Sequence, residues 1–408
     1  MLRMLVLFGV LRLWKDRGSA RCWRILSGGV NRLDISIIIM ASFIALNGVL
    51  LFREFGALNY QLGNLYTTFG VYFLLRYFIR DEDDVVLFIR TVAFVAIFIA
   101  GVMSWEFLTG HNPYSILNGA RSSFYATLME RDDRFRATGC FAHPILAGTF
   151  GAVTIPLFVL LWWRGKGNRA LAATAMVAST VIVLTCNSST PILAFGGGVL
   201  ALCLWPVRGW MRPLRWAIVT TLVSLHIVMK APVWHLISRI DISGGSSSYH
   251  RYMLVDQCIR HFTDWCLLGV KSTADWGWDM WDTCNQYVGT ADTSGLIPFI
   301  ALIAAIIYGF KFVGRARKRS GMSNRQRLTM WALGAALFAN VVAFFGIGYF
   351  DQSIVPWYGL LAAICTTQIE VSKNADFGER IGEVSSLALS RRGEFNSKEE
   401  PQPVWLSE

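Results

Sequence analysis

Apolar residues occur along this chain in long uninterrupted runs, not in the short alternating patterns of exposed strands. The runs are about 20 residues long, which is the length that an α-helix needs to cross the hydrocarbon core of a bilayer. We therefore predict an all-α, polytopic membrane bundle of about ten transmembrane helices. The expected spans are residues 33–52, 58–78, 85–108, 143–163, 170–185, 191–205, 216–234, 296–313, 328–347 and 356–369.

The charges in the gaps between these runs indicate which side each gap faces. Basic residues of membrane proteins concentrate in short cytoplasmic gaps. If the basic N-terminus is cytoplasmic, alternate gaps carry the basic clusters within 164–169, 208–215 and 311–327. We therefore expect both termini in the cytoplasm and a single membrane domain over residues 1–370. The tail 371–408 contains Ser, Glu, Lys and Pro with few apolar residues, which predicts a disordered cytoplasmic segment.

The composition agrees with a membrane protein and disfavours other classes. Hydrophobic residues make up 54% and charged residues 16% of the 408 residues, whereas soluble domains carry about a quarter charged residues. The net charge of +11 lies largely in the gaps, so it predicts topology and no nucleic-acid partner. Eight cysteines include no C-x-x-C pair, and we expect no metal site and no cofactor. Residues 1–14 are expected to form a retained helix at the membrane interface.

Two predicted outer (periplasmic) loops, 109–142 and 235–294, are too long to be simple turns. Long loops between ordered elements commonly carry function. The second loop contains apolar residues at helical spacing after a Gly-Ser run at 244–248, which predicts an amphipathic helix along the membrane surface. In this helix Asp256 and Arg260 are one turn apart and predict a surface ion pair. We expect the functional residues in these two loops.

The segment 134–148 carries the densest chemical signal, where the first outer loop enters a span. Arg134 and Arg136 keep their charge at any working pH and offer paired planar donors to phosphate, which suits an anionic lipid head group. A structural alternative is that these arginines only pair with nearby acidic residues on a solvated face, namely Glu130, Asp132 and Asp133. His143 precedes Pro144 at the expected start of a span, where it either binds a phosphate or caps the junction.

The pattern R-x-x-G-x-F-x-H-P at this junction resembles the signature of the O-antigen ligase and polysaccharide polymerase superfamily of bacterial inner membranes. Arg136, Gly139, Phe141, His143 and Pro144 match it. Two later blocks match in order and topology. They are the Ser-rich break at 187–191, and a third block with Arg251, Leu268, Gly269, Cys284, Asn285, Gln286, Tyr287, Ser294, Gly295 and Leu296. The resemblance covers roughly residues 134–313.

The chain departs from the family pattern at two positions. Many members have Asn after His-Pro, where this chain has Ile145, and the ligases commonly have His where this chain has Cys284. A thiol is a poor replacement for an imidazole base, because only its thiolate is strongly basic. We rank Asp282 first as a replacement base, and a solvated loop carboxylate is the alternative interpretation. A mechanism without an enzymic base also stays open.

The resemblance implies a membrane glycosyltransferase in surface polysaccharide biosynthesis. It implies transfer of a glycan from an undecaprenyl diphosphate carrier to an acceptor hydroxyl, on a glycan or a lipid, at the periplasmic face of the bacterial inner membrane. Membrane lipids are the other expected partners. The implied catalytic residues are Arg136, Arg251 and Asp282, and the implied substrate-binding residues are Arg134, His143, Asn285, Gln286 and Tyr287.

Two other functional classes compete with this interpretation. A transporter or flippase of lipid-linked sugars also uses a basic cavity, but polar residues deep in spans and symmetric repeats are its expected signs. A non-catalytic envelope-assembly protein would explain the missing family histidine. The residues do not distinguish a ligase from a polymerase, and they do not give the sugar, the linkage or the oligomeric state.

Overall fold

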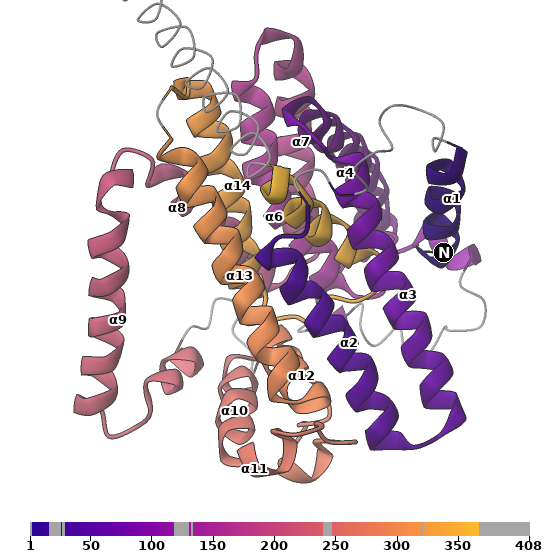
Figure 1. The fold of residues 1–408 in the computed structure, drawn as a ribbon, viewed down its shortest axis with the longest axis vertical. Coiled ribbons are helices and arrows are strands. Elements are labelled where there is room, and N and C mark those ends of the chain that lie inside the picture. Colours follow the sequence, from indigo (N-terminus) through magenta and orange to yellow (C-terminus); the bar gives the residue numbers. More distant parts are fainter. Residues whose placement is uncertain are drawn as a thin grey trace, which may run out of the picture.

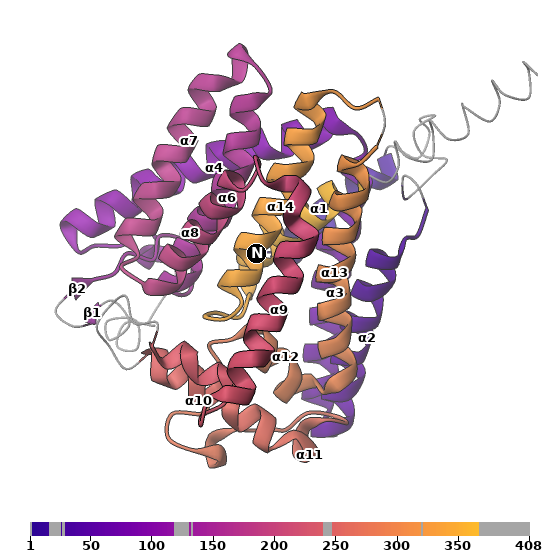
Figure 2. The same cartoon turned by 90° about the vertical axis from the view of Figure 1, so that its left-hand side faces the viewer.

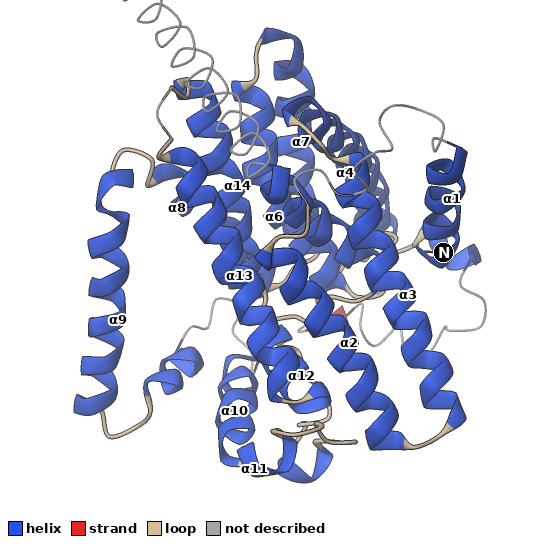
Figure 3. Ribbon diagram, in the orientation of Figure 1, coloured by secondary structure: helices blue, strands red, loops and turns tan. Residues whose placement is uncertain are grey.

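The protein is described by a computed structural model, which is built almost entirely of helices (Figures 1 and 3). The described residues are 2–15, 26, 29–117, 130–131, 134–239, 247–319 and 321–366. The predicted disordered tail 371–408 lies outside the described residues, as does much of the first long outer loop. The all-α prediction is confirmed for the described chain.

The long helices come first and last, and a group of shorter helices lies between them. The long helices are α1 (Leu2–Lys15), α2 (Arg32–Phe52), α3 (Phe55–Phe78), α4 (Glu82–Thr109), α6 (Pro144–Trp163), α7 (Lys166–Thr185), α8 (Ser189–Cys203), α9 (Met211–Val228), α13 (Leu296–Arg317) and α14 (Asn324–Ala343), followed by a helix over 354–366. The helices within the second predicted outer loop are α10 (Ser247–Arg260), α11 (Phe262–Trp265) and α12 (Gln286–Ser294), and none of them exceeds 14 residues.

Short 3-10 helices and one small strand pair connect these elements. The 3-10 helices are η3 (Pro113–Leu117), η4 (Arg208–Trp210), η5 (Val233–Arg239), η6 (Ala274–Trp276) and η7 (Asp351–Ser353). The strands β1 (Glu130–Arg131) and β2 (Arg134–Phe135) pair antiparallel, with Glu130 opposite Phe135 and Arg131 opposite Arg134. The helix predicted in the second outer loop is confirmed as α10.

Five helices within the described chain are long and apolar enough to cross a membrane: α2, α4, α6, α7 and α13. The pair α8 and α9 would add a sixth span if it counts as one, because the two pass the test together although a bend of 107° separates them. Alone, α8 has 15 residues, which is short for a crossing of about 30 Å. A helical membrane protein is thus supported, whereas the count of ten spans stays a prediction.

The centre of the bundle is α6, in which every residue except Val159, Trp162 and Trp163 is buried. Glycines let its neighbours approach closely. A side chain at Gly151 would lie 2.8 Å from the Ser179 carbonyl oxygen of α7, and one at Gly148 would meet the Cys186 thiol. Close packing around this helix explains why α4, α7, α8 and α14 all contact it.

Two helices lie at the periphery. α9 has no buried residue and stands away from the bundle in Figure 1, where its contacts are with η4 and η5 at its ends. The expected position of α1 at the membrane interface stays a prediction, and in the structure α1 runs alongside α3. Arg3 lies against Gly63, Val6 against Gly70, and the Arg12 guanidinium lies 5.4 Å from the Phe78 ring centroid. The small glycine positions of α3 leave room for this packing, which the polarity pattern of residues 1–14 did not reveal.

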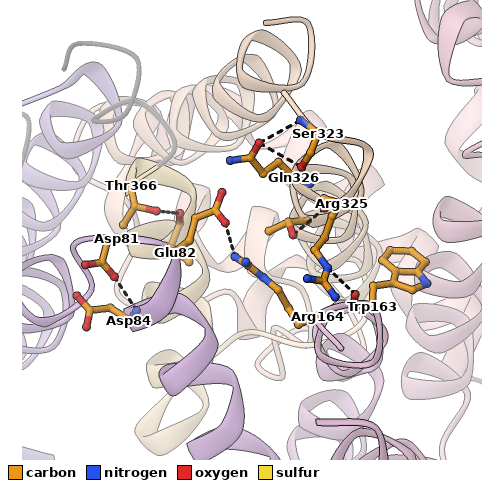
Figure 4. A network of polar contacts seen from close by, with 11 residues as sticks. Asp81, Glu82, Asp84, Trp163, Arg164, Ser323, Arg325, Gln326 and Thr366 are labelled. Atoms are coloured by element: carbon orange, nitrogen blue, oxygen red, sulfur yellow. Dashed lines mark hydrogen bonds and ion pairs between the residues drawn. The ribbon is translucent and has the colours of Figure 1, made fainter. Parts of the chain in front are cut away.

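Helix ends that the topology prediction assigns to one side also lie together. Figure 4 shows the end predicted to be cytoplasmic, where Arg164 after α6 forms an ion pair with Glu82 of α4. Arg325 of α14 donates to the Trp163 carbonyl oxygen at 3.1 Å in the same network. At the opposite end of the bundle, α10, α11 and α12 lie together below α13 and beside the lower part of α2 (Figures 1 and 2).

Candidate functional site

The candidate site is built around residues 186–190, which we call the α7–α8 turn and which comprise the junction after α7 and the first two residues of α8. Its backbone breaks the helix at Asn187, which adopts the left-handed conformation with φ of 47°. Asn tolerates this conformation better than most residues. Ser188 is extended before α8 begins, and Pro191 lies in the first turn of α8, where no backbone N–H is needed. The sequence at 187–191 thus dictates a sharp turn with hydroxyl side chains.

Arg136 reaches this turn from the segment that follows β2. The backbone N–H of Ala137 donates to the Thr185 carbonyl oxygen at 3.0 Å, which ties this segment to the end of α7. The Arg136 side chain is 5% exposed, and its Nε donates to the Cys186 carbonyl oxygen at 3.4 Å. The guanidinium is therefore buried against the α7–α8 turn.

Arg251 reaches the same turn from the first half of α10. One guanidinium nitrogen donates to the Thr190 hydroxyl at 2.8 Å, and the Ser189 hydroxyl lies 3.4 Å from the other. Two arginines, one from each of the two predicted outer loops, thus contact one five-residue segment. The sequence predicted both residues but not that they converge.

His143 forms the N-cap of α6, because its Nδ1 accepts a hydrogen bond from the Ile145 N–H at 3.1 Å. Burial lowers its pKa to about 4, and the neighbouring Arg136 charge acts in the same direction, whereas Asp282 opposes it. The ring is therefore neutral at pH 7, with Nε2 carrying the proton. The capping interpretation is confirmed, and Nε2–H stays available in chemical terms as a neutral donor to a phosphate oxygen.

Asp282 and Cys284 form a local pair in the loop before α12. The Cys284 thiol donates to the two Asp282 carboxylate oxygens at 3.0 and 3.1 Å. Burial raises the pKa of this thiol far above its usual range, and the Asp282 charge raises it further. Cys284 is consequently a protonated thiol that cannot act as a thiolate base. Asp282 is the acidic group that lies close enough to His143 to influence its pKa.

The polar groups of Asn285, Gln286 and Tyr287 form hydrogen bonds within the protein. The Asn285 side chain caps α12 by accepting from the N–H groups of Tyr287 and Val288 at 2.9 and 3.1 Å. Gln286 accepts from the Tyr349 N–H, and the Tyr287 hydroxyl donates to the Val341 carbonyl oxygen. These contacts hold α12 against the end of α14, so direct substrate binding by the three residues stays a prediction.

Arg134 lies in β2, opposite Arg131, and its side chain is outside the described part of the structure, as are Asp132 and Asp133. The predicted pair of Asp256 and Arg260 is confirmed at 2.7 Å, with the Arg260 side chain 68% exposed. Within the described residues, no group of three or more His, Cys, Asp or Glu is arranged to hold a metal ion.

Glu106 was not predicted from the sequence; it lies in the last turn of α4 and is fully buried. Its carboxylate accepts from the backbone N–H groups of Thr138 and Gly139, between Arg136 and His143. A signal was present in the sequence. An acidic residue near the C-terminal end of an apolar helix opposes the helix dipole and is costly in a bilayer, which by itself suggests a function.

The chain was compared with protein-family models and with curated proteins, and neither comparison finds a match. The resemblance to the O-antigen ligase and polymerase superfamily therefore rests on the motif residues and their order along the chain, and it stays a prediction.

Proposed function

We propose that the protein is a membrane glycosyltransferase of the O-antigen ligase and polymerase type, which transfers a glycan from undecaprenyl diphosphate to an acceptor hydroxyl. The observation that carries the proposal is the convergence of Arg136 and Arg251 on the α7–α8 turn. The proposed setting is the bacterial inner membrane, with about ten spans, cytoplasmic termini and the site at the periplasmic face.

In the proposed reaction, the bond between the anomeric carbon of the donor sugar and the diphosphate oxygen breaks. The acceptor hydroxyl oxygen forms the new bond to that carbon, and the diphosphate leaves as an anion on its lipid. Charge develops on the leaving oxygen, and fixed guanidinium donors stabilise such charge more in the transition state than in the ground state. Arg136 and Arg251 have this role, and His143 Nε2–H adds a neutral donor.

The proton of the acceptor hydroxyl goes to Asp282 in this proposal. Its position next to the protonated Cys284 thiol, and within electrostatic reach of His143, supports this role. Because general bases contribute about 10²- to 10⁴-fold to such reactions, Asp282→Asn should lower the transfer rate by at least about 100-fold. Transfer would be measured in vesicles with a lipid-linked donor. A transfer rate equal to that of the wild type would eliminate Asp282 as the base.

The proposed function is tested in a strain from which the gene is deleted. Surface polysaccharide and undecaprenyl-linked intermediates would be analysed after complementation with wild type, Arg136→Ala, Arg251→Ala or Arg260→Ala. Arg260 is the matched control, because it lies on α10 with Arg251 but its side chain is 68% exposed and pairs with the buried Asp256 carboxylate. We expect wild type and Arg260→Ala to restore the polysaccharide, whereas the other two insert normally and fail.

The intermediates also identify the reaction. Accumulation of full-length lipid-linked polymer in the deletion strain indicates a ligase, and accumulation of single lipid-linked repeats indicates a polymerase. An unchanged polysaccharide profile without accumulated intermediates would contradict the proposal. Normal complementation by Arg136→Ala or Arg251→Ala would contradict the assigned role of that arginine.

A further inference from the structure

A buried carboxylate holds the segment that carries Arg136 and His143. Glu106 Oε2 accepts from the backbone N–H groups of Gly139 at 2.7 Å and Thr138 at 3.1 Å. Its Oε1 accepts from the Thr138 hydroxyl at 3.1 Å and from the Asn112 side-chain amide at 3.0 Å. The side chain is 0% exposed, so these four donors replace the water that an exposed carboxylate would bind.

The same segment is also held from its other side. Asn112 donates to the Gly139 carbonyl oxygen at 2.8 Å, next to its bond to Glu106. Ala137 donates its backbone N–H to Thr185 of α7. Gly139 has a φ of 57°, and a side chain there would lie 2.9 Å from the Met103 Cγ of α4. Residues 137–139 are thus clamped between α4 and α7, with Arg136 directly before the clamp.

Burial of the Glu106 carboxylate has a free-energy cost, and close packing alone does not require a carboxylate at this position. A buried carboxylate loses its hydration, and near the C-terminal end of α4 the helix dipole also disfavours it. An apolar residue at position 106 would pack against residues 137–139 without losing hydration and without an unfavourable interaction with the helix dipole. The carboxylate, in contrast, fixes two consecutive backbone N–H groups in direction, which an apolar contact cannot do.

We propose that Glu106 is a positioning residue that sets the place of the Arg136 guanidinium at the α7–α8 turn, and thereby the affinity of the site for a lipid diphosphate. This inference rests on the proposed function. Glu106 acts through the backbone of Thr138 and Gly139, and it does not contact the substrate.

The test compares Glu106→Gln with Glu82→Gln. Both glutamates lie on α4, but Glu82 pairs with Arg164 at the opposite end of the helix. A glutamine keeps the size of the side chain, yet its amide is a donor that faces the donor amide of Asn112. Hydrogen exchange of the peptide 136–143 reads the backbone hydrogen bonds directly, without any substrate. We expect at least about tenfold faster exchange at Thr138 and Gly139 in Glu106→Gln only.

The functional readout is the binding of undecaprenyl diphosphate to the purified full-length protein in lipid nanodiscs. Glu106→Gln should weaken binding by about tenfold. This is the effect of losing one charged hydrogen bond between a displaced Arg136 and the diphosphate. In an Arg136→Ala background, Glu106→Gln should have no further effect, because its contribution passes through Arg136. A purely structural glutamate would lower the melting temperature without this dependence on Arg136.

Several results would overturn the inference. Wild-type affinity in Glu106→Gln, or an equal further loss in the Arg136→Ala background, contradicts positioning while leaving the proposed function intact. If the wild-type protein does not bind undecaprenyl diphosphate, the proposed function is contradicted. The inference is then contradicted as well, even if hydrogen exchange shows that Glu106 holds Thr138 and Gly139. If Glu106→Gln does not fold, Asn112→Ala is the alternative variant, because it removes one donor to Glu106 and the hydrogen bond to the Gly139 carbonyl oxygen. We expect faster exchange and weaker diphosphate binding, both with smaller changes than in Glu106→Gln.

Discussion

The two ends of the helix bundle use arginine in different ways. At the end predicted to be cytoplasmic, Arg76 of α3 donates to both carboxylate oxygens of Asp34 on α2, at 3.0 and 3.2 Å. Both side chains are fully buried, and the Tyr72 hydroxyl donates to the same carboxylate. This arrangement ties one helix to another, so its consequence is stability.

At the opposite end, Arg136 comes from the segment after β2 and Arg251 from the short helix α10, whereas Arg76 lies in the last turn of the long helix α3. Arg136 and Arg251 contact a backbone carbonyl and two hydroxyl groups of the α7–α8 turn. The carboxylate of Glu106 acts one step away, on the backbone of the segment that carries Arg136. The comparison indicates that the place of an arginine in this fold, more than its burial, distinguishes an arginine that links two helices from an arginine of the candidate site.

The largest effect is expected from breaking the Asp34–Arg76 pair. Arg76→Ala leaves a buried carboxylate without its cation, which costs about 3–5 kcal/mol of the free energy of unfolding. Thermal unfolding in detergent and the yield of folded protein would measure this loss. Replacing both partners by apolar residues, Asp34→Leu with Arg76→Met, should cost less than Arg76→Ala alone, because no unpaired charge remains. Equal losses in the single and double variants would contradict a purely structural pair.

A smaller and opposite effect is expected at Asp292, in the outer helix α12. Asp292 is fully buried, and no cationic side chain pairs with its carboxylate within the described part of the chain. Burial raises its pKa to about 7. The unfolded state therefore releases this proton from about pH 4 upwards while the folded state retains it, so this group lowers stability as the pH rises to about 7.

Asp292→Asn keeps the shape and removes the ionisation. We expect it to stabilise the protein by about 2 kcal/mol at pH 8 and by less at pH 5, since the full cost of the acid is present only above pH 7. Melting temperatures of both proteins across this pH range would show the difference. A stabilisation that does not depend on pH would mean that the carboxylate is not the cause.

The helices themselves could be predicted from the sequence to a large extent, because apolar runs and polar gaps set where each one begins and ends. Packing partners were harder to predict. α1 lies along α3 at Gly63 and Gly70, but the spacing of these glycines does not identify which helix packs against them. α9 is as apolar at its centre as a span, yet none of its residues is buried.

The residues of the site were predicted one by one from the motif, whereas their roles depend on contacts between distant segments. Arg136 and Arg251 were predicted separately, each from its own loop, and their convergence on the α7–α8 turn was not predicted. His143 caps α6, and Asn285 caps α12, which local sequence favours but does not distinguish from ligand binding. Glu106 was missed because its four donors lie between 6 and 33 residues away in the chain.

The most direct test of the central claim is the binding of undecaprenyl diphosphate to the purified protein in nanodiscs. Wild type would be compared with Arg136→Ala, Arg251→Ala and the control Arg260→Ala, and undecaprenol without a phosphate would serve as the control ligand. We predict a preference for the diphosphate that falls by at least about tenfold in each of the first two variants and is unchanged in the third. Equal affinity in all four proteins would contradict the claim that the two arginines at the α7–α8 turn recognise the lipid diphosphate.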